Sequence, residues 1–507
     1  MEHHSFSEHF SASCLQHRQK PAITFLRRGQ PETRLSFLEL EQHTDRMASM
    51  FQSRGVSKGD RVILFFQKSL VFVAAHLALQ KLGAVTVPLN PDFKKSEMAY
   101  LLQDARAKVI FLETHNADLI KKNHAPITPL IVDSQKPLQD LDVWNAASDR
   151  IAPADIREND PGVMIYTSGT TGNPKGVILT QKNLIADALN IVDIWQINES
   201  DTICHALPLF HVHGLCFALH TALLAGAHVL LLDRFAPQDV IDILGKAEGD
   251  RRCTIFMAVP AMYAKLIGYL GEAKMDFSHL RLLTSGSAPL LPKDFKRIRI
   301  FFGKEPVERE GMSETGMNFS NPLQGKRKPG SIGLPLPGVN VRLVDAETGL
   351  DVPPGQTGEI WLQSPAITPG YWQKPDETAK AFMNDWFKTG DLGHVDTDGY
   401  YFLTDRLKHI IISGGENISP KEVEAVINQL SGIQESAVVG IPDEKWGEKV
   451  VAAVVKKSGA KVNADAVMSH CKRHLHNWKC PKEVVFVKEL PRNTMGKVLM
   501  ETVKAFV

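Results

Sequence analysis

Short apolar runs alternate with longer amphipathic stretches over the first four hundred residues of the chain. The runs "RVILFF" and "AKVIFLE", which begin at Arg61 and Ala107, have the length and β-branched content of buried strands, whereas "LVFVAAHLALQKLGAV" between them has the length of a helix. Strands that alternate with helices are typical of helices packed on largely parallel sheets. The pattern therefore predicts an α/β fold.

The longest apolar stretch, "LCFALHTALLAGAHVLLLD", is interrupted by His220, Gly226 and His228. A membrane-spanning helix needs about 20 residues that are predominantly apolar. We therefore interpret this stretch as a helix, a turn and a strand, and we predict no transmembrane segment.

From Gly338 onward the pattern becomes β-rich. The runs "VNVRLVD", "GEIWLQS" and "GYYFLTD" are separated by turns that contain glycine or proline. This pattern predicts a small barrel or sheet appended to the α/β part.

The pattern changes again after "DRLK", residues 405–408. In "SPKEVEAVINQL", Ser419 is placed as an N-cap and Pro420 at the first helical position. Strand-like runs "SAVVGI", "KVVAAVVKK" and "EVVFVK" and a second helix follow, which is enough for a small α+β domain of about a hundred residues. We therefore predict a domain over residues 1–405, a hinge at 406–408 and a smaller domain over 409–507.

Composition narrows the class of protein. The chain has 507 residues, of which 43% are hydrophobic and 23% charged, as in soluble globular proteins. With 58 Lys+Arg against 57 Asp+Glu, no net field favours nucleic acid. The six cysteines form no Cys-x-x-Cys pair, and the first twenty residues lack the apolar core of a signal peptide. We expect a cytoplasmic protein; the sequence carries no signal for an oligomeric state.

One loop between two strand-like runs suggests chemistry. Its glycines would let backbone N–H groups approach an anion, its hydroxyls add donors and its lysine adds a positive charge, so the loop suits a polyphosphate. It is not a Walker loop, because Gly176 rather than Ser or Thr follows the lysine. Taken alone, such a loop is as often a surface turn. The residues concerned are Thr167, Ser168, Gly169, Thr170, Thr171, Gly172 and Lys175.

The string "YTSGTTGNPKG" closely resembles the phosphate-binding signature of the adenylate-forming superfamily, and further motifs of that superfamily follow in the same order. They are "PLFHVHG", "GSAPLL", "EGMSETG", "WFKTGDLG", "DRLKHIIISGGENISPKEVE" and "PRNTMGK". The resemblance spans essentially the whole chain and is closest to acyl-CoA synthetases of the malonyl-CoA synthetase type. It implies a large N-terminal domain with two α/β lobes and a small β-barrel, followed by a mobile C-terminal domain.

The resemblance also assigns a nucleotide site. Glu314 would coordinate Mg²⁺, and His211 would position the acyl substrate. Glu310 stands where the family usually has an aromatic residue that stacks on adenine, which is a departure from the pattern. The residues implied around adenine and phosphate are Gly286, Ser287, Ala288, Pro289, Glu310, Gly311, Met312 and Ser313.

Further residues are implied near the C-terminus. Asp391 and Arg406 would bind the ribose hydroxyls, and Lys497 would stabilise the charge that develops between the carboxylate and the α-phosphate. Lys408 takes the family's hinge position, and the backbone at Gly414 and Gly415 would line the path of the pantetheine arm of coenzyme A.

The implied reaction has two halves and uses ATP, Mg²⁺ and coenzyme A. A carboxylate attacks ATP to give an acyl-adenylate and pyrophosphate, and the thiol of coenzyme A then displaces AMP. A carrier-protein-loading adenylation enzyme is less well supported, because no carrier domain follows Lys497. A non-catalytic nucleotide-binding relative would be expected to have lost Lys497, Glu314 or Asp391, and all three are present.

The acyl substrate is a small-molecule carboxylate, and its identity rests on one position. Malonyl-CoA synthetases carry an arginine on the helix of "VPAMYAKL" that pairs with the distal carboxylate, and this chain has Lys265 there. Lysine keeps the charge but loses the bidentate fork. A short dicarboxylate such as malonate is one expectation; if Lys265 merely faces solvent, a short- or medium-chain or aryl monocarboxylate is the alternative.

Overall fold

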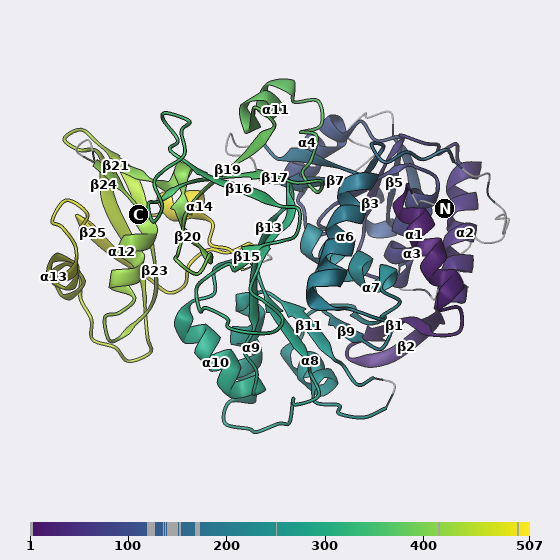
Figure 1. Cartoon of the computed structure of the whole chain (residues 1–507), viewed down its shortest axis with the longest axis horizontal. Coiled ribbons are helices and arrows are strands. Elements are labelled where there is room, and N and C mark those ends of the chain that lie inside the picture. The colour runs from purple at the N-terminus through teal and green to yellow at the C-terminus, as the bar shows by residue number, and fades with distance from the viewer. Residues whose placement is uncertain are drawn as a thin grey trace.

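The computed structural model describes residues 4–118, 127–134, 136, 138, 151, 154–167, 173–249, 251–413, 416–493 and 496–507. These residues form four sheets, two of them large and mostly parallel. In Figure 1 the two large sheets and their helices make up the greater part of the molecule, and the C-terminal sheet forms a smaller lobe at one end. The predicted α/β fold with a smaller C-terminal lobe is confirmed.

The first large sheet has six strands in the order β6-β5-β3-β4-β7-β8. The pairs β3–β4, β3–β5, β4–β7 and β5–β6 are parallel, and only the hairpin of β7 and β8 is antiparallel. The bounds are Arg61–Phe65 for β3, Val85–Pro88 for β4, Val109–Glu113 for β5, Thr128–Val132 for β6, Pro161–Thr167 for β7 and Lys175–Thr180 for β8.

The second large sheet has nine strands in the order β15-β14-β13-β12-β11-β9-β10-β1-β2. Its central strands β13 to β1 are parallel, and antiparallel strands β15, β14 and β2 close its two edges. The bounds are Pro21–Arg27 (β1), Gln30–Ser36 (β2), Thr202–His205 (β9), His228–Leu232 (β10), Ile255–Ala258 (β11), Leu282–Ser285 (β12), Val307–Met312 (β13), Gly316–Ser320 (β14) and Leu334–Pro335 (β15).

Several helices lie between the two large sheets. Helix α6 contacts β7 and β8 of one sheet and β14 of the other, while α2 contacts β1 and β2 as well as α3. The bounds are Phe6–Gln16 (α1), Phe37–Ser53 (α2), Leu70–Lys81 (α3), Gln181–Trp195 (α6) and Thr221–Leu224 (α7). Helices α4 (Lys95–Ala105), α8 (Pro237–Leu244), α9 (Pro260–Leu270) and α10 (Pro292–Phe302) complete this part; α8, α9 and α10 lie at the lower edge of the view in Figure 1.

The apolar stretch near His220 folds as predicted into a helix, a turn and a strand. The helix has π geometry over His213–His220, and all of its residues are buried. The turn follows α7 at Gly226, whose φ of +70° favours glycine, and the strand is β10. Within the described residues, no helix is long and apolar enough to cross a membrane.

The β-rich region after Gly338 is a five-stranded antiparallel sheet, ordered β16-β17-β19-β18 with β20 paired to β19. Its bounds are Asn340–Val344 (β16), Gly358–Gln363 (β17), Phe382–Met383 (β18), Trp386–Val395 (β19) and Tyr401–Arg406 (β20), and α11 (Pro375–Ala381) precedes β18. The last strand leads directly into the short 3-10 turn Leu407–His409. This turn contains the predicted hinge, which stays a prediction.

The C-terminal lobe is built on a second five-stranded sheet, ordered β22-β21-β24-β23 with β25 paired to β24. Its helix α12 begins as predicted, with Ser419 accepting from the backbone N–H of Glu422 and Pro420 in the first turn. The bounds are Ile411–Ser413 (β21), Glu416–Ile418 (β22), Ile433–Asp443 (β23), Gly447–Lys456 (β24), Glu483–Val487 (β25), Pro420–Ile427 (α12), Ala464–His474 (α13) and Met500–Lys504 (α14).

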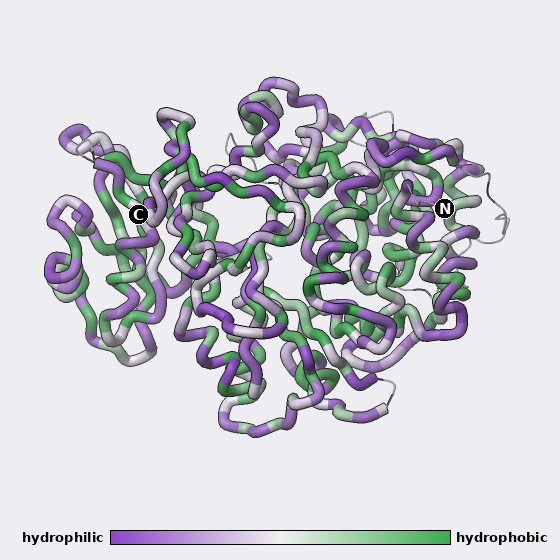
Figure 2. Tube along the Cα trace, viewed as in Figure 1, coloured by the Kyte–Doolittle hydropathy of each residue, from purple (hydrophilic) through white to green (hydrophobic). Residues whose placement is uncertain are grey.

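Hydrophobic residues gather on the strands and on the inward faces of the helices, as Figure 2 shows. One large buried cluster runs through both α/β lobes and a second packs on the six-stranded sheet, while the β-rich sheet and the C-terminal lobe have clusters of their own. The C-terminal lobe therefore has its own apolar core, which is the physical requirement for a unit that could move as a body.

Candidate active site

The β7–β8 hairpin holds the two ends of the predicted phosphate loop. Thr167 and Lys175 face each other as the last pair in the hairpin register. The loop residues between them that were predicted from sequence, Ser168, Gly169, Thr170, Thr171 and Gly172, lie outside the described residues. The Lys175 ammonium forms an ion pair with Glu377 and lies 5.2 Å from the ring centroid of Tyr371.

The turn between β13 and β14 carries Glu314. Its carbonyl oxygen accepts from the backbone N–H of Thr368 at 2.7 Å, and its Oε1 accepts from the Tyr371 hydroxyl at 3.3 Å. Tyr371 therefore connects Glu314 with Lys175 at the edge of the phosphate loop. Ser313, Gly311 and Met312 are half-buried in the same hairpin.

The surroundings of Glu314 suit a divalent cation. Burial raises the pKa of this carboxyl group, because the neighbouring protein groups do not fully stabilise its negative charge. The described residues contain no cluster of three or more His, Cys, Asp or Glu side chains that could hold a metal. Mg²⁺ in nucleotide sites is typically held by one or two carboxylates together with phosphate oxygens. Glu314 fits that limited role.

Asp391 and Arg406 form a two-point ion pair across the neighbouring strands β19 and β20. Nε of Arg406 lies 2.6 Å from Oδ1 of Asp391, and Nη2 donates to Oδ2 at 3.3 Å. The two residues are direct partners in the strand register, and Asp391 is buried. The pair presents fixed acceptors and donors side by side, which is the arrangement that two vicinal hydroxyls require.

Glu310 lies on β13, close to this ion pair. Its Oε2 accepts from Nδ2 of Asn318 at 3.0 Å. Burial, and then the negative charge of Asp391, raise the pKa of Glu310 to about 7. The position that usually carries an aromatic ring thus carries a carboxyl group that titrates near neutral pH.

The predicted adenine-binding turn follows β12. Ser287 adopts a φ of +67°, an uncommon left-handed conformation for a residue other than glycine. Its hydroxyl lies 3.1 Å from Nδ1 of His213, at the start of the π-helix. Gly286 is buried, Ala288 is half-buried and Pro289 is exposed.

His211 lies just before the π-helix, with its ring 4.6 Å from that of Phe210. Burial lowers the pKa of His211 to about 4, so the imidazole is neutral at pH 7. A neutral imidazole can position a substrate by hydrogen bonding without adding charge.

Lys497 reaches this region from the loop after β25. Its backbone N–H donates to Oδ1 of Asn493 at 2.9 Å. Desolvation of the ammonium group, and then the positive charge of Arg406, lower the pKa of Lys497 to about 8. The charges of Arg406 and Asp391 both act on the Lys497 ammonium group, so this lysine lies within electrostatic range of the ion pair.

Four predicted residues remain, and two of them lie outside the described residues. Lys408 lies in the 3-10 turn, where partial desolvation of its ammonium group and then the positive charge of Arg406 lower its pKa. Gly414 and Gly415 lie outside the described residues. Lys265 is exposed on α9, so the structure does not bring it into a buried site with the other candidates.

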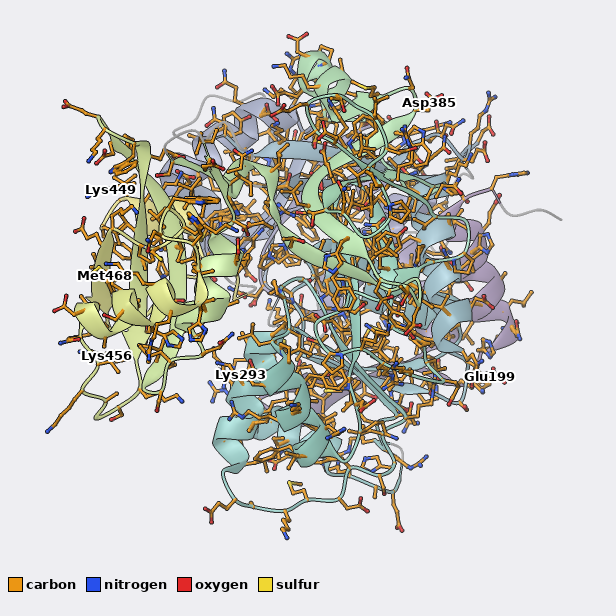
Figure 3. The ribbon with its side chains drawn as sticks, turned by 60° about the vertical axis from the view of Figure 1, so that its left-hand side comes forward. Glu199, Lys293, Asp385, Lys449, Lys456 and Met468 are labelled. Carbon is orange, nitrogen blue, oxygen red and sulfur yellow. The ribbon has the colours of Figure 1, made fainter. Side chains whose placement is uncertain are left out.

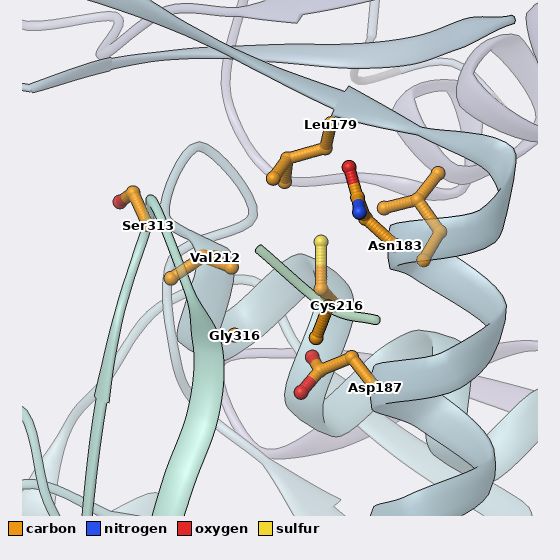
Figure 4. A pocket seen from close by; sticks show the side chains of 9 residues that line it. Leu179, Asn183, Asp187, Val212, Cys216, Ser313 and Gly316 are labelled. Atoms are coloured by element: carbon orange, nitrogen blue, oxygen red, sulfur yellow. The ribbon is translucent and has the colours of Figure 1, made fainter. Parts of the chain in front are cut away.

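A small cavity lies between α6, the π-helix and the β13–β14 turn. Figure 4 shows Asp187 of α6 and Cys216 of the π-helix on one side of it and Ser313 on the other. Oδ1 of Asp187 accepts from the backbone N–H of Met317 at 2.8 Å, and burial raises the pKa of Asp187 to about 7. Asp187 thereby fastens the first residues of β14 to α6 and supports the turn that carries Glu314.

Sequence reasoning did not identify Asp187, Tyr371, Asn318 or Arg309. Asp187 and Asn318 are single polar residues in a helix and a strand, and Tyr371 lies in a turn whose partners are distant in sequence. Arg309 lies between Glu308 and Glu310 in a short strand, and nothing in that local sequence distinguishes it from its charged neighbours.

Comparisons with known proteins find relatives along nearly the whole chain. The model of the AMP-binding enzyme family matches residues 10–372, and that of the AMP-binding enzyme C-terminal domain matches residues 422–497. The chain is 36% identical over 498 residues to an indoleacetate–CoA ligase of Aromatoleum aromaticum, covering 96% of this chain and 95% of the relative. It is 35% identical over 486 residues to a mitochondrial malonate–CoA ligase of Bos taurus, covering 88% and 82%.

A solved structure is similar throughout. The ATP-bound MatB from Rhodopseudomonas palustris aligns with a TM-score of 0.91 at 35% identity, covering 98% of each chain. The chain therefore belongs to the AMP-binding enzyme family. The predicted enzyme class, an AMP-forming acyl-CoA ligase, is confirmed, and ATP, Mg²⁺ and coenzyme A are the cofactors of this class.

Proposed function

We propose that the protein couples a short carboxylic acid to coenzyme A through an acyl-adenylate made at the site around Asp391, Arg406, Glu314 and Lys497. The observation that carries this proposal is the position of Lys497. It comes from the C-terminal lobe, yet it shares the electrostatic environment of Asp391 and Arg406 on the β-rich sheet.

The proposed first half-reaction joins two anions. The acid's carboxylate attacks the α-phosphate, and pyrophosphate leaves toward the β7–β8 hairpin, where Lys175 lies. Lys497 would donate to the oxygens on which charge develops, and Asp391 with Arg406 would hold the ribose. Mg²⁺ bound through Glu314 would neutralise phosphate charge.

The second half-reaction would use the same site after the C-terminal lobe turns. In this proposal residues 1–405 and 409–507 are the two bodies, and residues 406–408 with Lys408 form the hinge. Rotation would withdraw Lys497 and bring the segment with Gly414 and Gly415 to the pantetheine arm. The separate apolar core of the C-terminal lobe supports such a movement.

The acyl group is proposed to be a short dicarboxylate such as malonate. The bovine malonate–CoA ligase supports this proposal, whereas the indoleacetate–CoA ligase supports the alternative, a short- or medium-chain or aryl monocarboxylate. A cytoplasmic location stays a prediction.

The proposal is tested by AMP release. The wild-type protein with ATP, Mg²⁺ and coenzyme A should release AMP with at least one acid from a panel of mono- and dicarboxylates. Lys497→Ala should lower adenylation by about 100-fold or more, because it removes a charge that acts in the transition state. It should leave thioester formation from supplied acyl-AMP within about 2-fold.

Two results would contradict this proposal. The first is the absence of AMP release with every acid, from a protein whose melting temperature rises on adding Mg·ATP. This result would contradict the proposed ligase activity. The second is an equal loss of both half-reactions in Lys497→Ala. This result would contradict the proposal that Lys497 acts in adenylation only.

A further inference from the structure

Asp104 joins three segments of the chain near the β7–β8 hairpin. It lies in the last turn of α4, and its side chain is only 9% exposed. Its Oδ2 accepts from the Tyr166 hydroxyl at 2.7 Å, and its Oδ1 lies 3.2 Å from Nζ of Lys374. The hydroxyl of Tyr100, one helical turn earlier, lies 3.1 Å from the same Oδ1. One carboxylate group therefore connects α4 with β7 and with the segment after Tyr371.

Two of these contacts hold the ends of the hairpin strands. Tyr166 immediately precedes Thr167, the last residue of β7. On the other strand, the Tyr100 hydroxyl lies 3.0 Å from the carbonyl oxygen of Pro174, which immediately precedes Lys175 at the start of β8. This hydroxyl has one proton to share between the carbonyl oxygen and the carboxylate. Helix α4 thus contacts both strand ends.

The third contact supports the segment that reaches Glu314. The backbone N–H of Trp372 donates to a carbonyl oxygen of β8 at 2.7 Å, and Tyr371 forms an isolated bridge to the same strand. The indole Nε1 of Trp372 donates to the backbone carbonyl oxygen of Asp104 at 3.0 Å. The Tyr371 hydroxyl in turn donates to Glu314. The end of α4 therefore also fixes the residue that hydrogen-bonds Glu314.

The stability of α4 does not explain why this residue is an aspartate. A carboxylate in the last turn of a helix is disfavoured by the helix dipole, and the other residues of this turn are uncharged. The rings of Tyr100, Tyr166 and Trp372 pack against the apolar cluster on the six-stranded sheet. Burial, and then the hydrogen bond to Asp104, raise the pKa of Tyr166, so its phenol stays protonated and donates.

We propose that Asp104 is a positioning residue for ATP, because through Tyr166 and Tyr100 it sets the spacing of the two hairpin ends that carry Thr167 and Lys175. The inference rests on the proposed function, in which the pyrophosphate part of ATP binds at this hairpin. The groups around the carboxylate are donors, so both of its oxygens must accept. An amide would offer one acceptor and would place a donor against a donor.

The phosphate end of the nucleotide is where the effect should appear. With the acid that gives the fastest AMP release, Asp104→Asn should raise the KM for ATP by about 10-fold or more, because a buried donor loses a charged acceptor. Inhibition by pyrophosphate should weaken by a similar factor. The KM for the acid, the inhibition constant of AMP and thioester formation from supplied acyl-AMP should each change by less than about 2-fold, since they do not depend on the hairpin.

The two tyrosines test the same contacts one at a time. Tyr166→Phe and Tyr100→Phe should each raise the KM for ATP by about 3-fold, because each variant removes one neutral donor and keeps the ring. AMP inhibition should again be unchanged, since AMP lacks the two phosphates that leave as pyrophosphate.

Asp201→Asn is the matched control. Asp201 is also a buried carboxylate that holds side chains together, since it accepts from Nε of Arg281 at 2.7 Å and from the Thr254 hydroxyl at 2.7 Å. It precedes β9, whereas His211 follows that strand, so it lies at the end of β9 away from the site. Asp201→Asn should lower the melting temperature without changing the KM for ATP. An equal rise of this KM in Asp201→Asn and Asp104→Asn would overturn the inference.

The readouts separate this inference from the proposed ligase function. If Asp104→Asn binds ATP and AMP in the same ratio as the wild type, the inference fails while the ligase function stands. If no acid releases AMP, the ligase function fails, and calorimetric Kd values for Mg·ATP and AMP test Asp104 instead. If Asp104→Asn does not fold, the tyrosine variants decide. An unchanged KM for ATP in both Tyr166→Phe and Tyr100→Phe overturns the inference, and a rise in either supports it.

Discussion

In the proposed nucleotide site, Glu310 would make the binding of ATP depend on pH. An aromatic ring at this position would bind the base through stacking, independently of pH. The carboxyl group found here lies near Asp391, Arg406 and Arg309, and its pKa is raised to about 7. Above pH 7 it adds a negative charge beside a site that must receive a polyanion, and below pH 7 that charge is removed.

We therefore predict that the KM for ATP rises with pH in the wild type. A single charge a few ångströms away at a partly solvated site is worth on the order of 1 kcal/mol, or about 5-fold in KM between pH 6 and pH 8. Glu310→Gln should have the low KM at both pH values, because glutamine resembles the protonated carboxyl. Initial rates at saturating acid and coenzyme A measure this.

The quantity to compare is the ratio of the KM values of wild type and Glu310→Gln. ATP and Lys497 also titrate in this pH range, but they contribute equally to both proteins. If the ratio of KM values for wild type and Glu310→Gln is the same at pH 6 and pH 8, Glu310 has no electrostatic effect on ATP.

Which residues the sequence could identify follows from how locally each one is specified. Lys175, Asp391 and Lys497 lie in glycine- or proline-containing segments whose residue order is distinctive. Asp104 and Asp187 act through neighbours that are far away in the chain, and their surroundings in the sequence are those of any helix. Lys265 occupied the right motif, but its exposure depends on how α9 packs.

At the scale of elements, the β13–β14 hairpin is held in place by Asp187 of α6. Strands and helices were predictable here because short apolar runs alternate with amphipathic ones, but the π geometry of the helix at His213 was not. A π-helix differs from an α-helix in hydrogen-bond pattern and not in residue pattern, so periodicity cannot distinguish the two. The hydrogen bond from the backbone N–H of Met317 to Asp187 could not be predicted from the sequence either.

We predict that Asp187→Ala weakens Mg·ATP binding although Asp187 lies behind the turn. The backbone N–H of Met317 would lose its acceptor, at a cost of about 1–3 kcal/mol for a buried donor. The turn that carries Glu314 would then be less well fixed, and the Mg²⁺ concentration for half-maximal activity should rise. A lower melting temperature should accompany this change.

Asp187→Asn is the matched control. Its amide oxygen can still accept from Met317, and it resembles the neutral carboxyl that the raised pKa of Asp187 favours near neutral pH. Equal Mg²⁺ requirements in the alanine variant and the wild type would exclude a positioning role for Asp187.

At the scale of the whole molecule, the C-terminal lobe meets the α/β part at α9 and α10. Nζ of Lys293 on α10 donates to the carbonyl oxygen of Gln434 at 3.4 Å, and Figure 3 shows Lys293 at the side of α10 that faces the C-terminal lobe. The loop of Lys497 meets the start of α9, where a Cβ atom on Gly496 would lie 2.6 Å from Cβ of Ala261.

We predict that Gly496→Ala impairs adenylation selectively. The φ of +78° at this position costs an alanine about 1 kcal/mol, and the added methyl group would also collide with Ala261. Adenylation should fall by about 10-fold or more, while thioester formation from supplied acyl-AMP should change by less than about 2-fold.

Gly459→Ala provides the matched control, because Gly459 has a φ of +76° with no atom within 4 Å of the added Cβ. It carries the same backbone strain without the collision, and adenylation should be nearly normal. If both variants lose adenylation equally, backbone strain alone explains the loss and the contact with Ala261 has no role.

The contact between Gly496 and Ala261 has a consequence for the order of events in a catalytic cycle. Because the two surfaces fit closely at this contact, the lobe can form it in one orientation only. A partly rotated lobe would therefore not be stabilised by the contact. The change between the two half-reactions would then be a switch between two lobe positions, without a stable intermediate position. In the proposed cycle, the seated lobe would shield the acyl-adenylate from water, so that little ATP would be lost to hydrolysis before coenzyme A binds.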